Sequence, residues 1–140
     1  MNTDVQRLPL FWISLQFVVM DYSFSLWKQG QELNQFQIDL GCDTDDLALH
    51  FNPRFHDDAD GTVLVCNSKT AGCWGDEKRE IHNPLQRGAD VKIVLKLVGD
   101  VFEVQLPDGQ EVQFPNRVGM DTISYIRVTG DFKLKSFKIC

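Results

Sequence analysis

The amino-acid sequence predicts an all-β fold built from antiparallel strands, and three observations support this. From Phe36 onward, short runs of alternating apolar and polar residues follow one another along the chain. Gly, Asp and Pro separate these runs, as hairpin turns require. No amphipathic helical spacing competes with the runs. Short strands at this spacing are typical of a sandwich or a barrel.

The expected strands follow in order, and most alternate between apolar and polar residues. They are residues 36–40, 47–51, 62–67, 91–97, 101–106, 111–114, 123–128 and 132–139. Turns are expected at Gly41 with Asp43, Asp60-Gly61, Gly72, Gly88, Gly99-Asp100, Pro107-Asp108-Gly109 and Gly130-Asp131. In the last run, lysines interrupt an apolar strand, which indicates a solvent-facing or edge position.

The size and composition of the chain indicate one globular domain. The chain has 140 residues, of which 43% are hydrophobic and 24% are charged. This length fits a single domain with a real core. The 14 Lys and Arg residues against 20 Asp and Glu residues give a net charge of −6. Because a phosphate backbone selects for basic surfaces, nucleic acids and anionic membranes are not expected as partners.

The longest apolar stretch lies near the N-terminus, at residues 8–20. It is shorter than the ~20 residues that a membrane-spanning helix needs, so we expect no membrane insertion. It follows Arg7, as a secretion signal would, but no small-residue cleavage site comes after it. Its aromatic and β-branched residues favour a buried or edge strand. We expect residues 1–22 to be an atypical N-terminal segment, separate from a domain at residues 23–140.

The cysteines and histidines show no metal-binding or disulfide pattern. The cysteines are Cys42, Cys66, Cys73 and Cys140. They form no CxxC pair, have no histidine at zinc-finger spacing, and are too few for a disulfide scaffold. We therefore expect reduced thiols in a cytosolic compartment, with the thiol in the run 62–67 buried and inert. No metal or cofactor is expected.

The most unusual polar cluster lies in the run HFNPRF at residues 50–55. Side chains alternate across a strand, so His50, Asn52 and Arg54 are expected on one face, with the two phenylalanines on the other. Pro53 cannot donate to a strand ladder, which indicates either an edge strand or a local irregularity. Taken alone, these residues also fit an ordinary amphipathic strand.

A second polar set lies downstream and contains Asn67, Trp74, Glu77 and Arg79. Trp74 follows a turn and precedes a charged run, so we expect its ring to be exposed. A flat aromatic ring suits the apolar face of a sugar, whose hydroxyls can be bound by neighbouring polar groups. Arg54 or Arg79 beside Glu77 is expected to form charge-assisted pairs that hold these groups in place.

These residues resemble the carbohydrate-recognition motif of the galectins. The parts of the motif are HFNPRF at 50–55, V-x-N at 65–67 and W-x-x-E-x-R at 74–79. The similarity extends from about Phe36 to Cys140, and its nearest form is the single-domain prototype galectin. It includes PDGQEVQFPNR at 107–117 and GDFKLKSF at 130–137. The resemblance implies that residues 23–140 are a carbohydrate-recognition domain with a jelly-roll-like β-sandwich of two antiparallel sheets.

The resemblance also implies a non-catalytic lectin that binds β-galactosides, such as lactose and N-acetyllactosamine, in a shallow groove without metal. His50, Asn52 and Arg54 would then bind the axial 4-hydroxyl of galactose, and Trp74 would stack on its apolar face. An equatorial epimer would leave buried polar groups unpaired, at about 1–3 kcal/mol each. If His50 acts as the neutral imidazole, binding should weaken as the pH falls toward and below about 6.5.

The remaining motif residues would bind other parts of the sugar. By the same resemblance, Asn67 and Glu77 would hold the 6-hydroxyl of galactose. Arg54, Glu77 and Arg79 would reach the adjacent glucose or N-acetylglucosamine. The carboxylates Asp58 and Asp60 in the following loop either tune this groove or are solvated loop charges.

The sequence departs from the galectin pattern in its N-terminal half. The family has an intact strand and a turn between its Gly-x-x-Leu and F-x-I-x-L motifs. Here Gly30-Gln31-Glu32-Leu33 runs almost directly into residues 36–40, so a strand is expected to be missing. Three interpretations stay open for residues 8–20: they replace the lost strand, they cover the sheet edge, or they come from an altered transcript start or exon choice.

Two rival functions are weighed against the lectin. Paired carboxylates, such as Asp57 with Asp58 or Glu77 with Glu80, occur in glycosidases. An arginine beside Glu77 would keep that carboxylate ionised and unsuited to general-acid chemistry, so no enzyme is expected. The second rival is a galectin-like protein-interaction domain that has weakened or lost sugar binding because of its shortened N-terminal half.

The resemblance carries two further implications for the biology of the chain. Prototype galectins commonly dimerise through their terminal strands and so crosslink glycans, but only the C-terminal strand is recognisable here. Homodimer formation is therefore left open. Galectins are made in the cytoplasm and exported to the extracellular space by a non-classical route, and the same localisation is expected here.

Overall fold

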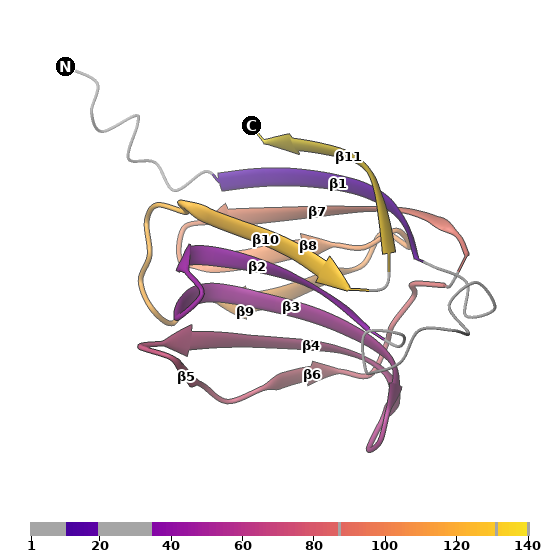
Figure 1. Cartoon of the computed structure of the whole chain (residues 1–140), viewed down its shortest axis with the longest axis horizontal. Helices are drawn as coiled ribbons and strands as arrows, with labels where there is room; N and C mark the ends of the chain where they lie inside the picture. The colour runs from indigo at the N-terminus through magenta and orange to yellow at the C-terminus, as the bar shows by residue number, and fades with distance from the viewer. Residues whose placement is uncertain (1–10, 20–34, 87, 131, 140) are drawn as a thin grey trace.

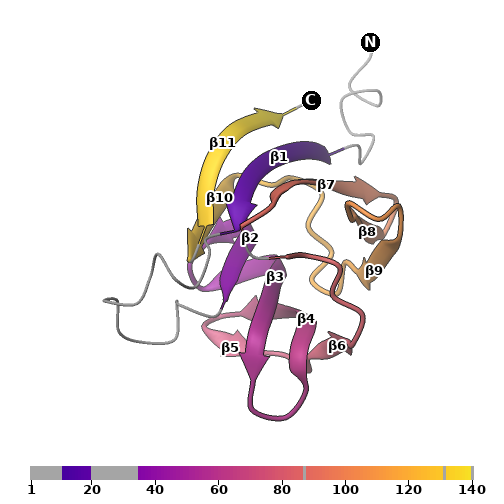
Figure 2. The ribbon, with the colours of Figure 1, turned by 90° about the vertical axis from the view of Figure 1, so that its right-hand side faces the viewer.

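The computed structural model of the chain describes residues 11–19, 35–86, 88–130 and 132–139. Within these ranges the chain forms two antiparallel sheets that face each other (Figures 1 and 2). The sandwich alternative of the predicted all-β fold is therefore confirmed. The described ranges contain no helix with the length and hydropathy needed to cross a membrane.

The first sheet has five strands in the order β11-β1-β7-β8-β9. Their bounds are β1 Phe11–Val19, β7 Asp90–Val98, β8 Val101–Gln105, β9 Glu111–Pro115 and β11 Phe132–Ile139. Each neighbouring pair is antiparallel. The lysine-rich C-terminal strand β11 lies at the edge of this sheet, as its lysines predicted.

The second sheet has six strands, in the order β10-β2-β3-β4-β5, with β6 also pairing with β4. Their bounds are β2 Phe36–Asp43, β3 Asp46–Asp57, β4 Gly61–Thr70, β5 Cys73–Trp74, β6 Lys78–Glu80 and β10 Tyr125–Gly130. Every run expected to be a strand lies largely within a strand of one of the two sheets. The short strands β5 and β6 were not expected, because neither is long enough to show alternation.

Strand β1 is an internal strand, paired with β7 on one side and with β11 on the other. Its side chains Ile13 and Leu15 are fully buried between the sheets. This agrees with the first interpretation of the N-terminal apolar stretch, that it replaces a lost strand. The rest of residues 1–22, and the predicted boundary after residue 22, lie outside the described residues.

The core fills the space between the two sheets and follows the alternation of the strands. Its largest fully buried side chains include Phe36, Phe51, Phe102 and Phe114. Phe51 and Phe55 of β3 both face this core, as the alternation predicted. The burial of each such side chain stabilises the fold by about 1.5–3 kcal/mol. Because Phe51 and Phe55 are held in the core, the residues between them are held on the opposite face of β3.

Pro53 lies in the interior of the second sheet, so the prediction of an edge strand was wrong. Strand β3 pairs with β2 on one side and with β4 on the other. The β2–β3 ladder is interrupted at Pro53, which has no partner there, but the register shifts of this strand pair lie at Leu40/Gly41 and Gly41/Asp43 and not at the proline. The side-chain amide of Asn52 donates to the carbonyl of Phe36 at 2.8 Å, which gives that carbonyl a donor beside the proline.

The turn between β2 and β3 depends on a glycine and an aspartate, both predicted from the sequence. A Cβ atom on Gly41 would lie 2.2 Å from the carbonyl oxygen of Asp46, so only glycine allows this close approach. Asp43 then accepts hydrogen bonds from the backbone N–H groups of Asp45 and Asp46 at 2.8 and 2.9 Å. The turn fixes the register that carries the polar side chains of β3.

Candidate functional site

The predicted binding residues all come from one sheet. His50, Asn52 and Arg54 belong to β3, Asn67 to β4 and Trp74 to β5, while Glu77 and Arg79 lie just before and within β6. Since Phe51 and Phe55 face the core, the intervening residues of β3 project to the opposite side. We call this set of seven residues the polar face.

The strand register brings three polar side chains into one row across the sheet. Asp39 of β2 pairs with His50 of β3, which pairs with Asn67 of β4. All three residues are buried. Buried polar groups are costly unless they are hydrogen-bonded, so the partners of each one matter.

Trp74 supplies a flat apolar surface beside this row. Its side chain is exposed, as predicted, at 50% of its accessible area. The indole ring lies 4.7 Å from the ring of His50, centroid to centroid, with an interplanar angle of 57°. Lys69 places its ammonium group 4.8 Å from the indole centroid. The exposed indole ring of Trp74 therefore contacts the buried row of polar residues at His50.

Asn52 is almost fully buried and fixes the position of the Arg54 side chain. Its amide nitrogen donates to the carbonyl of Phe36 at 2.8 Å and to the side chain of Gln35 at 3.1 Å. Its amide oxygen accepts a hydrogen bond from Nε of Arg54 at 2.8 Å. The guanidinium of Arg54 is thereby held in the plane of the polar face.

An ion-pair network joins Arg54 to Arg79 through Asp57. One oxygen of Asp57 accepts from Nη1 of Arg54 at 2.9 Å, and the other accepts from Nη1 of Arg79 at 2.9 Å. Glu77 also bridges the two arginines, at 3.4 Å to Arg54 and 2.9 Å to Arg79. Asp60 adds a contact of 2.8 Å to Arg79. The predicted charge-assisted pairs are confirmed.

This network keeps Asp57 and Arg79 ionised. The guanidinium groups of Arg79 and Arg54 hold the pKa of Asp57 far below its usual range. Conversely, the carboxylates of Asp57, Asp60 and Glu77 raise the pKa of Arg79. A carboxylate held in this state cannot serve as a general acid near neutral pH. The expectation that Asp57 has no glycosidase role is consistent with this geometry.

Asp57 contacts two residues of the polar face, although from the sequence it was weighed only as a catalytic carboxylate. Asp57 lies three residues after Arg54, near the hairpin end of the same long strand. This spacing was the one sequence signal that could have indicated its contact with Arg54. For Asp60, two interpretations were open, and the ion pair with Arg79 favours the one in which it tunes the site. Asp58 is exposed, as a solvated loop charge would be.

Arg117 was also missed, and it supports the segment that carries Trp74 and Glu77. Its Nη1 donates to the backbone carbonyl of Asp76 at 2.7 Å and approaches the amide oxygen of Asn67 at 3.4 Å. The amide nitrogen of Asn67 donates in turn to the carbonyl of Gly75 at 3.0 Å. Arg117 is far from these residues in the sequence, so no local pattern indicated the contact.

The cysteines have the environments expected of free thiols. Cys66 is buried in β4, and burial raises the pKa of its thiol to about 12. The prediction of a buried thiol is confirmed. Cys42 and Cys73 are free and exposed. Within the described ranges, no group of three or more His, Cys, Asp or Glu side chains is placed to hold a metal ion.

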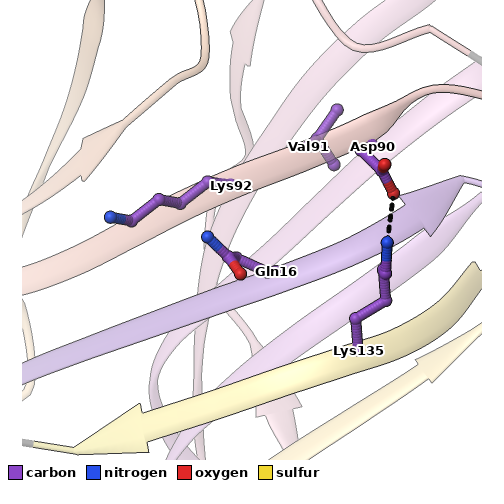
Figure 3. Close-up of a pocket in the computed structure, with 5 residues that line it drawn as sticks. All are labelled: Gln16, Asp90, Val91, Lys92 and Lys135. Carbon is purple, nitrogen blue, oxygen red and sulfur yellow. Dashed lines mark hydrogen bonds and ion pairs between the residues drawn. The ribbon is translucent and has the colours of Figure 1, made fainter.

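A cavity of about 330 Å³ lies on the other sheet, on strands β1, β7 and β11 (Figure 3). Its lining residues are Gln16, Asp90, Val91, Lys92 and Lys135. Lys135 points toward Asp90 and forms an ion pair with it at 3.0 Å. The cavity contains no residue of the polar face, so the two features are separate.

Comparisons with known proteins show a family match over most of the chain. The family described as galactoside-binding lectin matches residues 25–139. Galectin-1 of goat (Capra hircus) is 44% identical over 104 residues, which cover 74% of this chain and 77% of that protein.

Solved structures show the same similarity. The crystal structure of chicken galectin 2 superposes with a TM-score of 0.78 at 42% identity, covering 92% of this chain and 88% of that one. The structure of CG-16, described as a homodimeric agglutinin from chicken liver, has a TM-score of 0.78 at 35% identity, with 93% and 90% covered.

Proposed function

This chain belongs to the galectin family of β-galactoside-binding lectins, which are not enzymes, and from that premise we propose how its own residues hold the sugar. The carbohydrate-recognition domain is residues 23–140, and the binding site is the polar face. The single observation that carries this proposal is the contact between the half-exposed Trp74 and the buried, hydrogen-bonded row at His50.

The 4-hydroxyl of galactose binds at β3. The guanidinium of Arg54 keeps N–H groups beyond those used by Asn52, Asp57 and Glu77. The amide oxygen of Asn52 keeps a lone pair, and a neutral His50 ring keeps one nitrogen acceptor. A hydroxyl carries one hydrogen, so an axial 4-hydroxyl donates to one of these acceptors and accepts from Arg54, while the C–H face of the sugar ring lies on Trp74.

The rest of the disaccharide binds along β4 and β6. Asn67 uses one amide hydrogen on the carbonyl of Gly75, which leaves the other for the 6-hydroxyl of galactose. Glu77 accepts from this same hydroxyl. Arg54, Glu77 and Arg79 face the adjacent glucose or N-acetylglucosamine, with Asp57 fixing both guanidinium groups.

The alternative of a galectin-like domain with weakened sugar binding has no support from the comparisons. Its motivation was a distorted binding surface caused by the shortened N-terminal half. Strand β1 instead completes the first sheet between β7 and β11. The polar residues of β3 and β4 are bonded to one another and to the backbone, as a formed binding site requires.

Retention on immobilised lactose tests this proposal. The wild-type chain should be retained and then released by free lactose, whereas Trp74→Ala and Arg54→Ala should flow through while staying folded. Trp12→Ala is the matched control, because Trp12 is an exposed tryptophan of the other sheet. Unchanged retention of Trp74→Ala, or flow-through of the wild-type chain, would contradict the proposed site.

We further propose that the chain forms a homodimer through its edge strands. Strands β10 and β11 each lie at the end of their sheet, and edge strands offer unpaired backbone groups. Strand β11 also exposes Leu134, Phe137 and Ile139 at 43%, 42% and 53%. A second copy that covers these apolar side chains is consistent with the homodimeric relative CG-16.

Light scattering after size exclusion tests the dimer. Phe137→Lys should convert a dimer to a monomer, because a charge in an apolar contact is poorly tolerated. Val98→Lys, at an exposed apolar residue of β7, should leave the dimer intact. A monomeric wild-type chain at micromolar concentration would argue against this assembly.

The same membership supports cytoplasmic synthesis followed by non-classical export to the extracellular space. Free thiols at Cys42, Cys66 and Cys73 fit folding in a reducing compartment. A tagged chain in cultured cells should reach the medium even when transport from the endoplasmic reticulum is blocked. Loss of export under that block would contradict the route.

A further inference from the structure

We propose that Asp39 is a positioning residue that fixes the tautomer of His50, so that the imidazole presents an acceptor and not a donor to the ligand. This inference rests on the proposed function for the identity of the ligand. Its structural part, the tautomer of His50, stands independently of any sugar.

The contact between Asp39 and His50 is short, buried and set by the sheet register. The two residues are direct cross-strand partners on β2 and β3. Oδ1 of Asp39 lies 2.6 Å from Nδ1 of His50. The two residues are only 4% and 8% exposed, so bulk water competes little for this bond.

The orientation of the Asp39 carboxylate is fixed by a second hydrogen bond. Its other oxygen, Oδ2, accepts from Nε2 of Gln37 at 2.9 Å. Gln37 and Asp39 are two residues apart on β2, so their side chains lie on the same face of the strand. The carboxylate is therefore held from both sides, and Oδ1 stays directed at the ring of His50.

The proton on the imidazole follows from this geometry. An ionised carboxylate can only accept hydrogen bonds, so Nδ1 of His50 must carry the hydrogen that is shared with Asp39. A neutral imidazole has one N–H, which leaves Nε2 with a lone pair. No protein group within the described residues binds Nε2. The ring therefore offers an acceptor to a ligand.

The consequence for recognition is a defined direction for the hydrogen bonds. A hydroxyl bound between His50 and Arg54 must donate to the imidazole and accept from the guanidinium, because Arg54 can only donate. With the opposite tautomer, His50 and Arg54 would both donate to the same oxygen. The hydroxyl would then leave its own hydrogen without these partners, which costs affinity.

The molecule contains a second His–Asp pair that serves as an internal control. Nε2 of His82 lies 2.6 Å from Oδ2 of Asp108, and this pair is exposed. The carboxylate lies on the other ring nitrogen, so the same reasoning predicts the opposite tautomer for His82. The pair lies outside the polar face, and its disruption should not change sugar binding.

Nitrogen-detected NMR of chain labelled with 15N in histidine tests the proposal at neutral pH. In the wild-type chain, His50 should show a protonated Nδ1 and an unprotonated Nε2. Asp39→Asn is nearly isosteric, but its amide can donate or accept, so His50 should become a mixture of both neutral tautomers. Lactose affinity should then fall about tenfold. Asp108→Asn should change only the His82 signals.

The outcomes separate this inference from the proposed function. A wild-type His50 that carries its proton on Nε2, or populates both tautomers, would overturn the role of Asp39 even if lactose binds. Retention of a single Nδ1–H tautomer with full lactose affinity in Asp39→Asn would also overturn it. A wild-type chain with the predicted tautomer and no lactose binding would instead contradict the proposed function alone.

Discussion

Two regions of the molecule reverse the usual relation between polarity and burial. On the polar face, Asn52 and Asn67 are at most 4% exposed, and so is Asp39 beside them. On β11, Leu134 and Phe137 are more than 40% exposed. The polar residues are buried because each has hydrogen-bond partners, whereas no element among the described residues covers the apolar residues of the edge strand. Burial here is decided by neighbours more than by residue type.

The largest expected difference between the regions is in stability. Phe51→Ala in the core should lower the free energy of unfolding by about 3–5 kcal/mol, through lost burial and a cavity. Phe137→Ala should change it by less than about 1 kcal/mol in the monomer, because surface substitutions are nearly neutral. Urea unfolding measures both values, and equal costs would show that β11 is covered within one chain.

Asp57→Asn should weaken lactose binding by about 100-fold, because charge-assisted bonds to two guanidinium groups are lost. Asp58→Asn is the matched control, since Asp58 is the exposed neighbour in the same loop. The lactose affinity of Asp58→Asn should stay within about twofold of the wild-type value. Titration calorimetry measures both variants. A similar loss of affinity in both would show that the charge of the loop matters and that the ion pairs of Asp57 with the two arginines do not.

The dependence of stability on pH tests the ion-pair network. The lowered pKa of Asp57 means that its contribution is complete above the ordinary value of 3.8 and is lost only as the pH falls through the lowered value. The unfolding cost of Asp57→Asn should therefore stay constant from pH 8 down to about pH 5.

The measurement is the free energy of unfolding of the wild-type chain and of Asp57→Asn at each pH value. If the difference in unfolding free energy between the two proteins already disappears above pH 5, the ion-pair network is weaker than the lowered pKa of Asp57 implies.

The smallest expected effect concerns the thiols. Cys42 and Cys73 are exposed and should react with a thiol reagent in the folded chain at pH 8. Cys66 should react only on unfolding, because burial raises the pKa of its thiol to about 12. Mass spectrometry of labelled peptides identifies each site. Rapid labelling of Cys66 in the native chain would show that β4 opens easily.

The strands and the polar face could be predicted because their signals are local. Alternation along β3 placed Phe51 in the core and His50 on the opposite face, and the turn at Gly41 and Asp43 followed from glycine and aspartate chemistry. Trp74 was expected to be exposed from its position after a turn. In each case, the residues that decide the structure are close in the sequence.

The contacts missed from the sequence depend on the pairing of strands. The bond between Asp39 and His50 requires the register of β2 on β3, and the contact of Arg117 with Asn67 joins residues that are distant in the chain. Pro53 was compatible with an edge or an irregularity, and only the sheet order shows that β3 is internal. Alternation gives the face of a side chain but not its partner.

Titration calorimetry with lactose and with cellobiose, its counterpart with an equatorial 4-hydroxyl, tests the central claim that the polar face selects an axial hydroxyl. Lactose should bind at one site per chain, and cellobiose should bind at least about tenfold more weakly, because unpaired groups at His50 and Arg54 cost about 1–3 kcal/mol each. Equal affinities for the two disaccharides, or no heat with lactose, would contradict it.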